Sequence, residues 1–197
     1  MELIYKICYC IVYPFTSFRY PHRTIGRENI PDGAAVVCAN HSSNADPLLV
    51  AFAVRKRVPL HFMAKIELFR IPVLGWLLRK AGIIPVDRDK ADVTSLKTAM
   101  KYLKNGEKVG IFPEGRRVGE GESAEAKTGA VRLAVRMGVP VLPIYVPRSK
   151  PLFKRLDLVI GKPYYIELNK KAATNEEYHK ATEELMTAIE SLRADKI

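Results

Sequence analysis

Short apolar runs alternate with longer amphipathic segments along most of this chain. Runs rich in β-branched residues predict strands, and segments with apolar residues three or four positions apart predict helices. The predicted strands are AAVVCAN, LHFMAK, IIPVD, KVGIFP, VPVLPIYV and LDLVIG, and the predicted helices are LLVAFAV, IPVLGWLLRKAG, KADVTSLKTAMKYLKNG and KTGAVRLAVRMG. Thr174 and Glu177 form a capping box that opens one more helix, which we expect to end near Arg193. The alternation predicts an α/β fold, a single domain in which helices flank a mostly parallel central sheet.

The opening segment, residues 1–20, is apolar and aromatic and stands apart from this alternation. Its apolar stretch is shorter than the roughly 18 to 20 residues that a membrane-spanning helix needs, and no small-residue cleavage site follows it. We expect a helix that lies in a membrane interface, with ordinary packing on the domain as the alternative. In the interface, Tyr5, Tyr9, Tyr13, Arg19 and Arg23 would lie near the lipid headgroups. Residues 21–197 then form the folded domain.

Composition and charge narrow the choice of partner. Apolar residues make up 48% of the chain and charged residues 27%, which excludes disorder and a polytopic membrane protein. Lysine and arginine outnumber aspartate and glutamate by 32 to 21, so an anionic partner is favoured. No RNP, helix-turn-helix or zinc pattern accompanies this charge, and nucleic acid is therefore not an expected partner. Cys8, Cys10 and Cys38 lack ligand spacing, so we expect structural thiols and no metal site.

The stretch NHSSNADP places His41 five positions before Asp46, directly after a predicted strand. An imidazole in such a loop can act as a general base near neutral pH, and a bend before Pro47 would bring the Asp46 carboxylate onto its N–H group. The alternative is an ordinary polar turn in which Asp46 caps the helix that Pro47 begins. The stretch by itself does not choose between a catalytic pair and a helix cap.

The stretch FPEGRR follows another predicted strand. Gly115 permits a sharp turn, the guanidinium groups of Arg116 and Arg117 match phosphate oxygens, and Lys127 lies where the next helix is expected to open. The alternative is a solvated loop in which Glu114 pairs with one of the arginines.

Cations also follow two further predicted strands. Lys65 ends one strand and Arg88 follows another, and both could converge with Arg117 on one phosphate. The remaining histidines, His22, His61 and His179, have no acidic residue at a suggestive spacing, and we expect structural or surface roles for them.

Four blocks, taken in order, resemble the glycerophospholipid acyltransferase family and in particular its bacterial 1-acyl-sn-glycerol-3-phosphate acyltransferases. NHSSNADP is similar to the N-H-x-x-x-x-D block, GIIPVDR to the second block, FPEGRR to the third, usually F-P-E-G-T-R, and VPVLPIYV to the apolar fourth. The resemblance covers roughly Gly26 to Val146 and implies a glycerolipid acyltransferase-like α/β fold.

The resemblance implies transfer of a fatty acyl group from acyl-CoA or acyl-carrier protein to the sn-2 hydroxyl of 1-acyl-sn-glycerol 3-phosphate, which gives phosphatidate. Neither a covalent acyl-enzyme nor a cofactor is implied. By this resemblance His41 is the general base, and Asp46 orients its imidazole and stabilises the charged form. The acceptor-binding block supplies Glu114, Gly115 and Arg117, and by position Lys65 and Arg88 are further phosphate contacts. We expect a peripheral or monotopic enzyme on the cytoplasmic face of the cell membrane.

One position departs from the family pattern, because Arg116 stands where threonine is usual. The departure leaves open a different acceptor, such as glycerol 3-phosphate, another lysophospholipid or a lyso-aminolipid. A non-catalytic module that binds anionic lipid is the alternative from another class.

Overall fold

The computed structural model describes residues 2–55, 58–87, 92–119, 121–122 and 124–193. The helices are α1 (Glu2–Arg19), α2 (Asp46–Val54), α3 (Pro72–Lys80), α4 (Val93–Lys104), α5 (Gly129–Met137) and α6 (Asn175–Ser191), with short 3-10 helices at Arg27–Asn29 and Ile66–Arg70. The strands are β1 (His22–Ile25), β2 (Ala35–Ala39), β3 (Leu60–Lys65), β4 (Ile84–Val86), β5 (Lys108–Ile111), β6 (Val141–Tyr145) and β7 (Leu156–Ile160).

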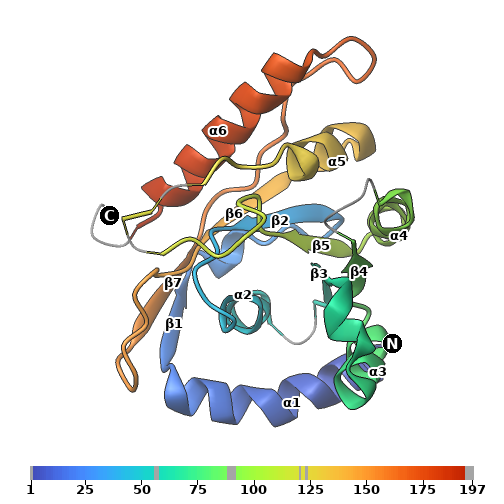
Figure 1. Cartoon of the computed structure of the whole chain (residues 1–197). Coiled ribbons are helices and arrows are strands. Elements are labelled where there is room, and N and C mark those ends of the chain that lie inside the picture. The colour runs from blue at the N-terminus through green and yellow to red at the C-terminus, as the bar shows by residue number, and fades with distance from the viewer. Residues whose placement is uncertain (1, 56–57, 88–91, 120, 123, 194–197) are drawn as a thin grey trace.

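The strands form one sheet in the order β1-β7-β6-β2-β5-β3-β4 (Figure 1). Neighbouring strands run parallel except at the β6–β7 pair, which is antiparallel. The predicted α/β fold with a mostly parallel sheet is confirmed. Because β6, β2 and β5 are parallel neighbours in the middle of the sheet, the loops that follow them leave the same edge.

The strand β1 is a difference from the sequence-based expectation. Its four residues, HRTI, lie in a part of the domain for which the sequence predicts no strand, yet they pair in parallel with β7, with His22 opposite Leu156. A strand of this length carries too little pattern to be recognised, and its extended conformation is stabilised by a partner more than a hundred residues away.

The alternation of side chains along β2 divides the core into two layers. Val36 and Cys38 face the layer that contains α4, α5 and α6, whereas Val37 and Ala39 face the layer that contains α2. Figure 1 shows these helices on opposite sides of the sheet. All five residues of β2 are buried, as expected for a central strand with helices on both faces.

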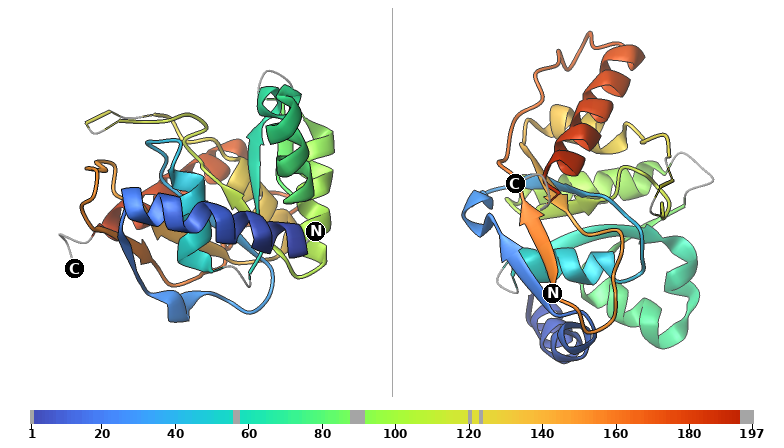
Figure 2. Two further views of the ribbon diagram at one scale, coloured as in Figure 1. Left: turned by 90° about the horizontal axis from the view of Figure 1, so that it is seen from below. Right: turned by 90° about the vertical axis from the view of Figure 1, so that its left-hand side faces the viewer.

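The helix α1 lies across α2 on the outer side of the second layer (Figure 2). Its tyrosines point towards the domain: Tyr5 is buried, and the rings of Tyr9 and Tyr13 each pack edge-on against Phe52 of α2, with centroids 4.9 Å apart. The tyrosines therefore show the packing on the domain that was the alternative for this segment, although Tyr13 remains 39% exposed. Their position near lipid headgroups stays a prediction.

The opposite face of α1 is apolar and open. Its exposed residues recur at helical intervals, and they are Leu3, Ile7, Ile11, Phe15 and Phe18. Within the described residues, no helix combines the length and apolar character needed to cross a bilayer.

Candidate active site

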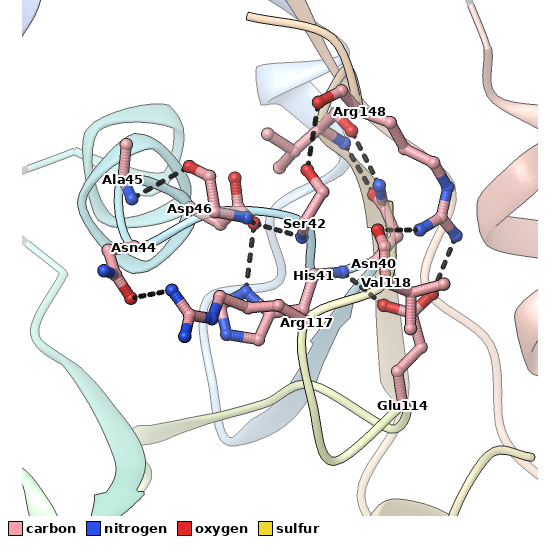
Figure 3. A network of polar contacts seen from close by, with 12 residues as sticks. Asn40, His41, Ser42, Asn44, Ala45, Asp46, Glu114, Arg117, Val118 and Arg148 are labelled. Atoms are coloured by element: carbon pink, nitrogen blue, oxygen red, sulfur yellow. Dashed lines mark hydrogen bonds and ion pairs between the residues drawn. The ribbon is translucent and has the colours of Figure 1, made fainter. Parts of the chain in front are cut away.

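The loops after β2, β5 and β6 meet at one edge of the sheet and build the candidate site (Figure 3). Asn40 joins the ends of β2 and β6, because its side-chain amide donates to the carbonyl of Val146 at 2.7 Å and its oxygen accepts from the N–H of Val146 at 2.8 Å. The N–H of Val118 donates to the carbonyl of His41 at 2.8 Å and ties the β5 loop to the β2 loop. These bonds fix the backbone on both sides of the histidine.

The predicted pair of His41 and Asp46 is present in the structure. His41 Nδ1 lies 3.0 Å from Asp46 Oδ2. A carboxylate only accepts, so Nδ1 carries the proton in this bond and the lone pair of Nε2 is left to accept one. The Asp46 side chain is fully buried, while that of His41 remains 13% exposed. A partly exposed imidazole is thus backed by a buried carboxylate.

Asp46 is not the helix cap. The cap residue of α2 is Ala45, and Asp46 stands in the first turn with its carboxylate directed back at the loop. Besides His41, Oδ2 accepts from the N–H groups of Ser42 at 2.6 Å and Ser43 at 2.7 Å. Of the two interpretations of NHSSNADP, the geometry favours the histidine–aspartate pair, and a turn of the loop rather than a cap brings the two side chains together.

The charge of Asp46 is stabilised despite its burial. Burial by itself raises the pKa of this carboxyl, but the hydrogen bond to His41, the Lys150 ammonium and the loop N–H groups together hold the pKa below its ordinary value. The carboxylate therefore remains ionised at neutral pH and can stabilise an imidazolium at His41.

Phe112 and Glu114, from the β5 loop, hold His41 from two directions. The ring of Phe112 stacks on the imidazole with centroids 4.3 Å apart. Glu114 is buried, and its Oε2 accepts from the backbone N–H of His41 at 2.5 Å while Oε1 lies 2.7 Å from Arg148 Nη2. The carboxylate of Glu114 thus supports the histidine backbone, and its predicted contact with the acceptor stays a prediction.

The two arginines of FPEGRR lie at the exposed rim of the site. Arg117 Nη1 donates to Asn44 Oδ1 at 3.1 Å, so this arginine lies beside the His41 loop. Arg116 is also exposed and lies 3.9 Å from Glu122. The predicted phosphate contacts of both arginines stay predictions.

Gly115 and Lys127 are in contact with each other. Gly115 has a φ of +65°, and a Cβ added there would lie 3.0 Å from Cε of Lys127. Lys127 does not open α5, because its N–H donates to the carbonyl of Pro113 at 2.8 Å and the helix begins two residues later at Gly129. The lysine is held beside the β5 loop.

Other predicted contacts lie further from the dyad or cannot be placed. Lys65 ends β3, is exposed and lies 3.4 Å from Glu67. Arg88 lies outside the described residues. His61 is buried towards the opposite edge of the sheet, where Nε2 lies 2.7 Å from Glu107 Oε2, and His22 packs on Phe52.

Two cations of the β6 loop were missed by sequence reasoning. Arg148 bonds to Glu114, to Glu190 of α6 and, through Nη1, to the carbonyl of Val118. Lys150 Nζ lies 2.8 Å from Asp46 Oδ1. The same signal that pointed to other cations, a strand end followed by basic residues, was present in VPRSK.

A cavity of about 280 Å³ lies behind Phe112, between the sheet and helices α4 and α5. Its apolar lining comes from Met63, Leu96, Ile111, Phe112 and Leu133, and its polar lining includes Lys127 and Ser95. The same phenylalanine therefore borders both the imidazole and this cavity. Among the described residues, no three His, Cys, Asp or Glu side chains are grouped so that they could hold a metal ion.

A mostly parallel sheet that presents a histidine–aspartate pair beside an arginine at its carboxyl edge defines a site for base-assisted chemistry on an anionic substrate. A family model described as Acyltransferase matches residues 22–147. The chain belongs to this acyltransferase family, and it is an enzyme of the acyltransferase class.

Named relatives agree with this assignment. The 1-acyl-sn-glycerol-3-phosphate acyltransferase of Bacillus subtilis (strain 168) is 36% identical over 168 residues, which cover 82% of this chain and 83% of the relative. The chloroplastic enzyme LPAT1 of Arabidopsis thaliana, which has the same name, is 36% identical over 68% of this chain and 36% of its own length. The crystal structure of the 1-acyl-sn-glycerophosphate (LPA) acyltransferase PlsC from Thermotoga maritima superposes with a TM-score of 0.66 at 29% identity, covering 98% of this chain and 78% of that chain.

Proposed function

We propose that this protein transfers a fatty acyl group from an acyl thioester to the sn-2 hydroxyl of 1-acyl-sn-glycerol 3-phosphate, producing phosphatidate. The observation that carries the proposal is the His41–Asp46 pair, in which Nδ1 is held by a buried carboxylate and Nε2 is left as the acceptor. The names of the relatives from Bacillus subtilis and Thermotoga maritima support the choice of acceptor.

In the proposed mechanism, His41 Nε2 takes the proton of the sn-2 hydroxyl as that oxygen attacks the thioester carbonyl. The imidazolium formed is stabilised by the Asp46 carboxylate. Collapse of the tetrahedral intermediate breaks the carbon–sulfur bond, and the thiolate leaves with the proton that the imidazolium returns. General base catalysis supplies about 10² to 10⁴-fold, so orientation of the substrates and backbone N–H donors to the oxyanion must supply the rest.

The acceptor's phosphate would be held by the cations at the rim of the site. Arg117 is directed at the His41 loop, and Arg116 and Lys127 come from the same turn and the segment after it. Planar guanidinium groups bind phosphate oxygens in pairs, which fixes the glycerol backbone as well as its charge. Lys65 and Arg88 remain predicted contacts at the neighbouring strand ends.

The acyl donor is proposed to be acyl-CoA or acyl-carrier protein, acting as a co-substrate and not as a bound cofactor. The apolar walls of the cavity behind Phe112 suit an acyl chain, and its depth would then set the preferred chain length.

We also propose that the protein docks on the cytoplasmic face of the cell membrane through α1. Support comes from its open apolar face, on which Phe15 and Phe18 are each 75% exposed. Phe15→Glu should strongly reduce binding to vesicles that contain anionic phospholipid. Val93→Glu is the matched control, because Val93 is exposed on α4 in the opposite layer. Equal loss in both variants would contradict docking through α1.

The central experiment offers purified protein lysophosphatidate, glycerol 3-phosphate and other lysolipids, each with acyl-CoA and with acyl-carrier protein thioester. Rapid transfer to lysophosphatidate is expected, together with a loss of at least about 10²-fold in His41→Ala. Near wild-type activity in that variant would refute the assignment of the general base. Vesicle binding without transfer from either donor would support the non-catalytic lipid-binding alternative instead.

The assay should also include an acceptor with a more acidic headgroup than lysophosphatidate, because of Arg116. The family usually has threonine here, and the added guanidinium lies at the exposed rim. Arg116→Thr should lower activity on a more acidic headgroup relative to lysophosphatidate if the arginine selects the acceptor. An unchanged ratio of kcat/KM values would remove Arg116 from the specificity determinants.

A further inference from the structure

Lys150, in the loop after β6, is a buried lysine attached to the histidine–aspartate pair. Its side chain is only 5% exposed, and Nζ lies 2.8 Å from Asp46 Oδ1. The same ammonium donates to Ser42 Oγ at 2.6 Å and to the carbonyl of Pro147 at 2.6 Å. One ion pair and two short hydrogen bonds thus offset the cost of removing the ammonium from water.

The two oxygens of Asp46 therefore serve different partners. Oδ2 receives His41 Nδ1 and two loop N–H groups, whereas Oδ1 faces Lys150. An aspartate with an unbalanced charge would favour the protonated imidazole, which cannot act as a base. An adjacent ammonium reduces this effect while it keeps the carboxylate ionised and in place.

We propose that Lys150 is a positioning residue for acyl transfer, which holds Asp46 and Ser42 in place and balances the aspartate charge that faces the His41 imidazole. This inference rests on the proposed role of His41 as general base. Lys150 does not touch the reacting atoms, and it acts through Asp46.

Other charged groups around the dyad are already paired with one another. Glu114 is bound by the His41 N–H and by Arg148, Arg148 also pairs with Glu190, and Arg117 bonds to Asn44 at the rim. Of the ionisable groups in these contacts, Lys150 is the cation that lies directly against the Asp46 carboxylate. Arg148 belongs to the same loop but acts on the backbone of His41 through Glu114.

The test compares the pH dependence of kcat/KM in the wild type, Lys150→Met and Lys150→Gln, with lysophosphatidate and an acyl thioester as substrates. Loss of the ammonium leaves the charge of Asp46 unbalanced, so the imidazole gains its proton at a higher pH. The acid limb should move upward by about one pH unit, which lowers kcat/KM on that limb on the order of tenfold and much less on the alkaline side. Lys150→Gln retains N–H donors for Ser42 and Pro147, and it replaces Lys150→Met in the test if the methionine variant does not fold.

Lys154→Met is the matched control, because Lys154 is an exposed lysine of the same segment and its loss should leave the profile unchanged. Lys150→Arg keeps the charge and should keep the wild-type acid limb, whatever its overall rate. A uniform fall in activity with an unmoved acid limb in both neutral variants would show a merely structural lysine and overturn the proposal. Retained activity in His41→Ala would instead refute the underlying general-base function, so the two failures are distinguishable.

Discussion

Replacing Asn40 by alanine should destabilise the protein far more than the same change at Asn44, four residues along the same loop. Asn40 is fully buried and makes both a donated and an accepted bond with the backbone of Val146. Asn44 is exposed and bonds only to the side chain of Arg117 among the contacts described.

The magnitude follows from the groups left behind. In Asn40→Ala, one buried N–H and one buried carbonyl of Val146 lose their partner, and each such group costs about 1 to 3 kcal/mol. Partial relaxation of the loop reduces the sum, so we expect a loss of about 2 to 4 kcal/mol in the free energy of unfolding. Asn44→Ala should stay within about 0.5 kcal/mol of the wild type.

Urea unfolding, followed by far-ultraviolet circular dichroism, measures both variants. With an m-value of about 2 kcal/mol/M, the Asn40→Ala midpoint should fall by about 1 to 2 M. The reasoning fails if Asn40→Ala loses less than about 1 kcal/mol at an unchanged m-value, because the two bonds to Val146 would then contribute little net stability.

Three further predictions follow from the site and the core. Folding lowers the pKa of Asp46, so its charge adds stability that is complete above the unfolded-state pKa and is lost as the pH falls through the lower folded-state value. In urea titrations below about pH 4, the free energy of unfolding should therefore fall less steeply with decreasing pH in Asp46→Asn than in the wild type. Equal slopes in the two proteins would contradict this. Burial raises the pKa of the Cys38 thiol to about 12, so mass spectrometry should find this cysteine unmodified by iodoacetamide in the native protein and alkylated after unfolding. Rapid modification of the native protein would show that solvent reaches β2. Gly115→Ala and Gly121→Ala both place alanine at a positive φ, but only the Cβ added at Gly115 meets the Lys127 side chain, with Cε 3.0 Å away. Only Gly115→Ala should therefore also raise the KM for the acceptor several-fold. Equal effects on KM in the two variants would remove Lys127 from acceptor binding.

Much of the secondary structure follows from short-range patterns. The six expected strands and the capping box of α6 are present, and the latter is complete, with Thr174 and Glu177 bonding to each other's backbone N–H. These features depend on side-chain periodicity and on contacts between residues a few positions apart, both of which a single sequence displays. The pairing of His41 with Asp46 belongs to the same class, because the partners lie only five positions apart in the sequence.

Long-range contacts explain what the patterns did not predict. The strand β1 exists through pairing with β7, and the tyrosines of α1 turn inward because α2 presents Phe52. In each case one segment has a conformation or orientation that depends on a distant surface, which local periodicity does not record.

The residues of the site divide in the same way, into those that local motifs predict and those that long-range contacts bring in. Residues of the β2 and β5 loops could be predicted from their own motifs, whereas Lys150 reaches Asp46 across more than a hundred positions of sequence. That contact depends on the strand order, in which β2 lies between β6 and β5 and the three loops share one edge. Sequence periodicity indicates that a segment is a strand but not which strand lies beside it, because neighbours in a sheet are chosen by the packing of the whole domain. The pairing of His41 with Asp46 could therefore be anticipated from the chain alone, while the contact of Lys150 with Asp46 became evident only once the sheet was assembled.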